Sequence, residues 1–133
     1  MRRNSALAFI ASLSIVFTAC QSTPADSEDK IAKALDDMNL SVEGSKAEIL
    51  VYRINGWRYV DKYNVILTLG NRDNYLVGLR HPCPGLNGAF KIGFTSTGNK
   101  VTKFDDIVVS NRGPGAMDER CGIKDIVLLK PRE

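Results

Sequence analysis

The chain has 133 residues, which is enough for one domain. Hydrophobic residues make up 44% and charged residues 25%, values typical of globular proteins that exclude a wholly disordered chain and a multi-span membrane protein. The formal charge is +3, but without residues 1–19, which contain Arg2 and Arg3 and no acid, 16 basic residues stand against 15 acidic ones. A charge so close to zero gives no electrostatic reason to expect a nucleic-acid partner.

The first segment has the order of a secretory signal. A cationic start at Arg2 and Arg3 precedes an apolar run over residues 6–17, which ends shortly before Cys20. The run is shorter than the ~20 apolar residues that a transmembrane helix needs. We therefore predict a lipoprotein signal peptide over residues 1–19.

The small residues directly before Cys20 resemble the lipobox of bacterial lipoproteins, in which the cysteine is acylated and becomes the new N-terminus. Thr18 and Ala19 fit this pattern, whereas Phe17 stands where the pattern most often has leucine. The resemblance implies a lipid anchor on Cys20, and Gln21 in place of an aspartate implies sorting to the outer membrane, with the domain facing the periplasm. The alternative is an ordinary signal peptide in which the cysteine is incidental.

Acylation of Cys20 leaves Cys83 and Cys121 as an even pair in an oxidising compartment. We predict that these two cysteines form a disulfide, which would close a loop of 39 residues. The loop-entropy model gives a stabilisation of about 3.9 kcal/mol for a loop of this length.

Residues 20–26 are small and polar and are predicted to form a short tether, which leaves residues 27–133 as a single β-rich domain. A helix is predicted over residues 27–40, with Ser27 as its N-cap. Four apolar side chains recur there at helical spacing: Ile31, Ala34, Leu35 and Met38. We expect this stripe to pack on the core rather than to bind a partner.

From residue 48 onward, short apolar runs separated by turn residues are typical of β-strands. Asn55-Gly56 predicts the turn of a first hairpin, residues 70–74 that of a second, and residues 96–100 a third turn. The pattern predicts a mainly β fold, a small antiparallel sandwich or barrel of about six or seven strands with one N-terminal amphipathic helix and one disulfide. An α+β fold is the alternative.

Two motifs could carry chemistry. Residues 93–100 look like a phosphate loop, but Asn99 interrupts the motif and β-type residues follow it. His81, the only histidine, could act as a base or join the cysteines around zinc, yet the chain has no Gly-x-Ser-x-Gly elbow and no close cysteine pairs. We therefore predict no catalytic residue, no metal site and no cofactor, and interpret the two motifs as a hairpin turn and a stiffened loop.

Aromatic and basic side chains gather in the predicted hairpins, and such residues suit sugar stacking, cation–π contacts or a protein interface. They define a possible binding face: Arg53, Trp57, Arg58, Tyr59, Tyr63 and Arg80. Packing in the core is the favoured role for Trp57. The aspartates at 61, 73, 105 and 106 are expected in turns or at rims, because neighbours on a strand face opposite ways and make poor catalytic pairs.

Several short motifs together resemble a family of small proteobacterial lipoproteins known only as a domain of unknown function. They are Arg53-Ile54, Trp57, Asp61, Tyr75-Leu76-Val77, Cys83-Pro84-Gly85-Leu86, Asp105-Asp106-Ile107, Cys121-Gly122-Ile123 and Ile126. The resemblance covers roughly residues 45–130. It supports the disulfide and an envelope location and implies no activity, substrate or catalytic residue.

These observations favour a non-catalytic binding module of the cell envelope, attached to the membrane by its lipid and binding a protein or a glycan. One alternative is an inhibitor of a wall-degrading enzyme, of the lysozyme-inhibitor type, because small disulfide-closed β-lipoproteins of that class have this general size. A small periplasmic enzyme using His81 or the aspartates is less favoured.

Overall fold

The computed structural model describes residues 24–111 and 117–133. The predicted signal peptide and Cys20 lie outside these residues. Within them, no helix is both long and apolar enough to span a membrane.

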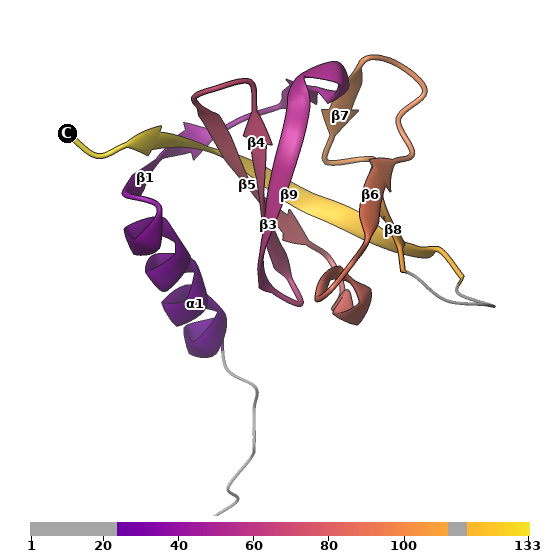
Figure 1. The fold of residues 1–133 in the computed structure, drawn as a ribbon, viewed down its shortest axis with the longest axis horizontal. Coiled ribbons are helices and arrows are strands. Elements are labelled where there is room, and N and C mark those ends of the chain that lie inside the picture. The colour runs from indigo at the N-terminus through magenta and orange to yellow at the C-terminus, as the bar shows by residue number, and fades with distance from the viewer. Residues whose placement is uncertain (1–23, 112–116) are drawn as a thin grey trace, which may run out of the picture.

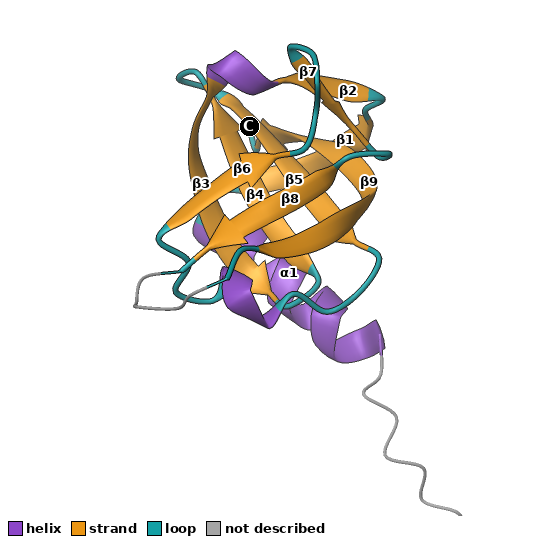
Figure 2. Cartoon of the chain, turned by 90° about the vertical axis from the view of Figure 1, so that its right-hand side faces the viewer, coloured by secondary structure: helices purple, strands orange, loops and turns teal. Residues whose placement is uncertain are grey.

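One antiparallel sheet organises the molecule. Its strands follow the order β3-β4-β5-β9-β8-β6, and β1 pairs with the far end of β9. The elements are α1 (Pro24–Asp37), β1 (Leu40–Ser45), β2 (Glu48–Leu50), a 3-10 turn η1 (Val51–Arg53), β3 (Ile54–Asp61), β4 (Asn64–Leu69), β5 (Asp73–Leu79), η2 (Pro84–Leu86), β6 (Lys91–Phe94), β7 (Lys100–Thr102), β8 (Asp106–Ser110) and β9 (Glu119–Pro131). The sheet curls into a half-barrel, and β2 and β7 form a separate two-stranded sheet at its upper end (Figures 1 and 2). The predicted mainly β, antiparallel fold is confirmed.

The sheet buries both of its faces. Val65, Leu67 and Val77 belong to the main core inside the half-barrel, whereas their neighbours Ile66 and Leu76 belong to a second core on the outer face. Successive side chains of a strand point to opposite faces, so β4 and β5 need apolar residues at nearly every position. The second core is where α1 packs, and the helix lies at the end of the half-barrel opposite β2 and β7 (Figure 2).

The helix is present but begins earlier than predicted. It starts at Pro24, inside the predicted tether, and proline suits the first helical turn because its missing N–H needs no partner there. Ser27 is therefore a helical residue and not the N-cap. The helix ends at Asp37, and Asn39 adopts a positive φ of 54° just beyond it.

The predicted apolar stripe of this helix packs on the second core, which confirms its expected role. Ala34 and Leu35 are buried there against Ile66, Leu76 and Leu129, which come from three different strands. The partly buried side chains of Ile31 and Met38 pack beside them.

The prediction of a first hairpin turning at Asn55-Gly56 is wrong. Both residues lie inside β3, where the register with β4 shifts between Ile54 and Gly56, and the turn between these strands falls at residues 62–63. The shift is a β-bulge, which accounts for the turn-like residues within a strand. At this bulge the side-chain amide of Asn55 donates a hydrogen bond of 2.8 Å to the carbonyl of Gly70, which follows β4.

Two further pairings differ from the sequence pattern. Residues 40–45, where no strand is predicted and where Leu40 is expected to end the helix, form β1 against β9. Residues 96–100 do not form the predicted hairpin turn, because the strands on either side of them do not pair with each other: β6 pairs with β8, and β7 pairs with β2. These pairings join segments that are distant in the sequence.

The predicted disulfide between Cys83 and Cys121 is present, and the two Cα atoms are 5.9 Å apart. Both cysteines are buried in the main core. The bond fastens the segment that leads into η2 to the start of β9, and so ties the middle of the chain to its last strand.

Candidate functional site

A cavity of about 550 Å³ opens at the upper end of the half-barrel, and we call it the mouth pocket. Its walls are the β2 segment, the end of η1, the end of β4, the middle of β5 and the start of β7: Lys46, Ala47, Glu48, Ile49, Leu50, Arg53, Leu69, Tyr75 and Lys100. Ile49, Leu69 and Tyr75 are buried parts of the main core, so the pocket has an apolar floor. Its size and mixed lining are typical of small-ligand sites.

The rim of the mouth pocket is charged. The Arg53 guanidinium lies 3.7 Å from a carboxylate oxygen of Asp73, and Lys100 forms an ion pair of 2.5 Å with Glu48. Lys46 adds a further cation. Three cations stand against two carboxylates, and the exposed ion pairs can exchange their partners for an incoming anion at little cost.

Tyr75 carries the one clear electrostatic perturbation in this region. Its side chain is 8% exposed, and burial raises the pKa of the phenol above its ordinary value of 10.0. The carboxylate of Asp73 raises the pKa further, while the Arg53 guanidinium lowers it. Tyr75 therefore stays a neutral hydrogen-bonding group on the pocket floor at ordinary pH.

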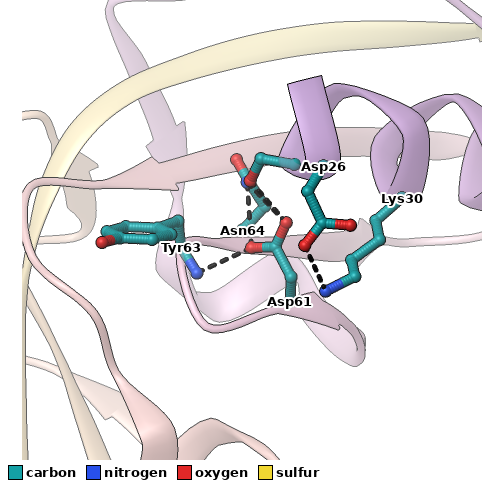
Figure 3. Close-up of polar contacts among 6 residues, drawn as sticks. Asp26, Lys30, Asp61, Tyr63 and Asn64 are labelled. Carbon is teal, nitrogen blue, oxygen red and sulfur yellow. Dashed lines mark hydrogen bonds and ion pairs between the residues drawn. The ribbon is translucent and has the colours of Figure 1, made fainter. Parts of the chain in front are cut away.

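A buried polar cluster lies at the opposite end of β3, where the chain turns into β4 (Figure 3). Asp61 and Asn64 are only 4% and 9% exposed. Asp61 Oδ2 accepts a hydrogen bond of 2.6 Å from Ser27 Oγ, and Oδ1 accepts bonds of 2.7 Å from the Tyr63 N–H and 3.0 Å from Asn64 Nδ2. Ser27 belongs to α1, so this cluster joins the helix to the barrel.

The cluster holds α1 against the barrel and is not arranged for proton transfer. Both carboxylate oxygens of Asp61 are occupied by donors from the protein itself. A cavity of about 230 Å³ lies beside it, and its outer wall includes Asp26 and Lys30, whose charged groups pair at 3.2 Å. Asp61 precedes the turn at residues 62–63 and accepts from the Tyr63 N–H, which is a turn role as expected, but its burial is not predicted by the sequence.

The structure separates the residues of the predicted binding face. Trp57 and Tyr59 point inward and pack against the main core, as favoured for Trp57. Arg58, between them, faces outward and pairs with Asp37 of α1 at 3.2 Å. Arg53 lies on the rim of the mouth pocket.

Of the other two predicted residues, Tyr63 lies beside the polar cluster and Arg80 directs its side chain to a different segment. The carbonyl of Tyr63 accepts a hydrogen bond from the Leu79 N–H, directly before Arg80, and the Lys62 ammonium lies 5.5 Å from the centre of the Tyr63 ring. Arg80 is exposed and donates to the carbonyl of Lys103 at 2.6 Å. The six residues thus occupy both ends of the barrel and do not form one surface.

Several other motifs take structural positions. Asp105 Oδ2 accepts bonds from the N–H and the hydroxyl of Thr102, which is a turn role as expected. His81 is exposed. Beside the disulfide, Glu119 accepts a bond of 3.0 Å from the Gly85 N–H, while both sulfurs are used in the Cys83–Cys121 bond.

The sequence reasoning missed Lys46 and Lys100 as members of a site. Both lysines are exposed. Nothing in the local pattern sets Lys46 apart, and Lys100 ends the phosphate-loop-like motif that we interpreted as a hairpin turn. Only the pairing of β2 with β7 brings their segments to the same mouth.

The whole chain, residues 1–133, matches the model of a family of unknown function, DUF6491, and belongs to that family. The resemblance to a family known only as a domain of unknown function is confirmed to this extent. Neither the curated proteins nor the solved structures include a match to this chain.

Proposed function

We propose that this chain is a periplasm-facing outer-membrane lipoprotein whose half-barrel is a non-catalytic binding module. The anchor would be the acylated Cys20, and the ligand would be an anionic group of an envelope protein or glycan bound in the mouth pocket. The observation that carries the binding role is the mouth pocket itself, which Lys46, Arg53 and Lys100 line together with Tyr75 and buried apolar residues of the main core.

The arrangement suits recognition of a negatively charged group. Arg53 and Lys100 can each turn from an exposed carboxylate partner to a ligand carboxylate or phosphate. The neutral phenol of Tyr75 can donate a further hydrogen bond from below. An apolar part of the ligand would rest on Ile49 and Leu69.

A photo-cross-linking residue in place of Ala47, an exposed residue that lines the mouth pocket and carries no binding group, tests this proposal in intact cells. We expect a reproducible adduct from position 47, weakened by Arg53→Glu, and mass spectrometry of the adduct would tell a protein from a glycan. The matched control is the same residue at Lys33, an exposed lysine of α1 remote from the mouth. Equal labelling from both positions, or none from position 47, would refute the mouth pocket as the binding site.

A further inference from the structure

The half-barrel is open along one line, which we call the seam. β3 pairs only with β4 and β6 pairs only with β8, so among the described strands each of these two has one free edge. A cavity of about 540 Å³ lies between the two edges, walled by residues 54–57 of β3, residues 92–94 of β6 and Val51. The seam is separate from the mouth pocket, with which it shares no lining residue.

The seam gives access to the main core. Ile54, Trp57, Ile92 and Phe94 are partly buried side chains that pack against that core and also line the cavity. A segment placed in the seam could therefore bury apolar side chains against an existing apolar surface, which is the main source of binding free energy for such segments.

The β6 edge also offers backbone hydrogen bonds. In an antiparallel ladder, every second residue directs its N–H and C=O groups toward the partner strand. The residues between them direct these groups away from the partner. The Thr95 N–H donates to the Asp106 carbonyl at 3.1 Å, in register with the β6–β8 ladder, so Gly93 also faces β8. Ile92 and Phe94 consequently direct their N–H and C=O groups to the free side.

The two edges differ in regularity. All four residues of β6 pair with β8 without a shift in register. β3 has shifts on both sides of its central residues, between Ile54 and Gly56 and between Tyr59 and Asp61. Bulges disturb strand pairing, so β6 is the better template for an added strand and β3 the opposite wall.

The charge that a ligand of the seam would meet on these two strands is positive and comes from Lys91, an exposed residue of β6. Arg58 of β3 is also exposed, but it faces outward and is already paired with Asp37 of α1. The one acid of these strands, Asp61, is buried and hydrogen-bonded. A segment with acidic residues beside its apolar ones would be favoured, and a basic one would be repelled.

We propose that the free edge of β6 binds an extended segment of a partner protein by strand addition, with alternate apolar side chains in the seam and acidic residues at its ends. The main-chain bonds would supply affinity and the seam would select side chains. This goes beyond the proposed ligand of the mouth pocket, because it assigns a second site and a polypeptide to fill it.

The probe is a fluorescent peptide of sequence Glu-Val-Thr-Val-Thr-Val-Glu, measured by anisotropy with the full chain in detergent micelles. We expect saturable binding that is about tenfold weaker for a copy with N-methylated central amides, since methylation removes donors to β6 and leaves the side chains in place. A copy with lysine in place of both glutamates should also bind more weakly. Absence of saturable binding, or equal binding of the methylated copy, overturns the proposal.

Residue-resolved hydrogen exchange of the same complex locates the bound strand. The amides of Ile92 and Phe94 should exchange quickly in the free protein and become protected with peptide, whereas Gly93, bonded to β8, should be protected in both states. Binding without protection of Ile92 and Phe94 would place the peptide elsewhere and overturn the proposal.

A pair of variants at one position supplies the genetic test. Ile92→Pro removes an N–H from the free edge, a position where strands tolerate proline, and should lower peptide affinity about tenfold. Ile92→Ala loses the same side chain and keeps the N–H, so it should bind more tightly than the proline variant. Equal affinities of the two variants, with equal melting temperatures, overturn the proposal. Lys100→Glu alters the mouth pocket and leaves the seam intact, so it should not change the affinity for the peptide. The proposal for the seam can therefore be refuted independently of the proposal for the mouth pocket.

Discussion

Tyr75 shows at the scale of one residue how the core and the mouth pocket are coupled. Its ring belongs to the main core, while Asp73 and Arg53 act on its phenol from the rim. Burial raises the pKa, which means that the folded protein holds the phenol proton more tightly than the unfolded chain does.

The raised pKa of Tyr75 predicts a loss of stability in alkali. The stabilisation is complete below the unfolded pKa near 10.0 and is lost as pH rises through the higher folded pKa. In urea unfolding, the free energy of the wild type should therefore fall more steeply above pH 10 than that of Tyr75→Phe, which has no phenol to ionise. Tyr52→Phe, at a tyrosine that is 71% exposed, should follow the wild type. Parallel curves for the wild type and Tyr75→Phe would contradict the expected linkage.

Trp57 and Arg58 show what a sequence can predict about single residues. Strand alternation places them on opposite faces, and the structure does so, with Trp57 toward the core and Arg58 away from it. The partner of Arg58 could not be predicted, because Asp37 comes from a helix that reaches this face only through the tertiary fold. The same limit applies to Asp61, whose burial depends on Ser27 of α1.

At the scale of the element, α1 is held to the sheet by two different kinds of contact. Its apolar stripe packs on the second core. At its start, Ser27 donates a part-buried bond to Asp61 and accepts one of 3.2 Å from Asn64 Nδ2. At its end, exposed ion pairs join Asp36 to Arg132 and Asp37 to Arg58. Among these polar contacts, the bond between Ser27 and Asp61 should contribute most to the stability of the interface, because solvent weakens the exposed ion pairs.

Two substitutions on this interface separate these contributions. Asp61→Ala leaves the donors of Ser27, Tyr63 and Asn64 without their acceptor and should lower the free energy of unfolding by about 3 kcal/mol. Asp37→Ala removes an exposed carboxylate from the same interface and should lower it by less than about 1 kcal/mol. Urea unfolding of both variants measures the difference. Similar losses of unfolding free energy in the two variants would show that the buried Asp61 contributes no more to stability than the exposed Asp37.

The elements differ in how far the sequence could predict them. Helical spacing predicts α1, and short continuous apolar runs bounded by turn residues predict β4, β5 and β8, because these patterns are local. Asn55-Gly56 was misread because a bulge inside β3 uses the same residue types as a hairpin turn. The pairing of β2 with β7 and of β1 with β9 joins distant segments, and no local pattern encodes it.

At the scale of the whole molecule, the helix and the mouth pocket lie at opposite ends. α1 is at the lower end of the half-barrel, and β2 and β7, which help to line the mouth pocket, are at the upper end (Figure 2). Residues 20–23 would separate an acylated Cys20 from the start of α1, a stretch that spans at most about 14 Å when fully extended. A lipid on Cys20 would therefore hold the helix end near the bilayer, with the mouth pocket facing away from it.

This orientation can be measured on the acylated protein in liposomes that carry a lipid-bound quencher. A fluorescent amino acid at Lys30 in α1 should be quenched strongly, and the same fluorophore at Lys100 on the mouth pocket should be quenched little, because quenching falls with distance from the bilayer. Cys20→Ser should abolish quenching at both positions and leave the melting temperature unchanged, since the anchor would act on location and not on the fold. Equal quenching at Lys30 and Lys100 would mean that the domain lies on its side. Membrane binding that persists in Cys20→Ser would mean that another part of the chain attaches it.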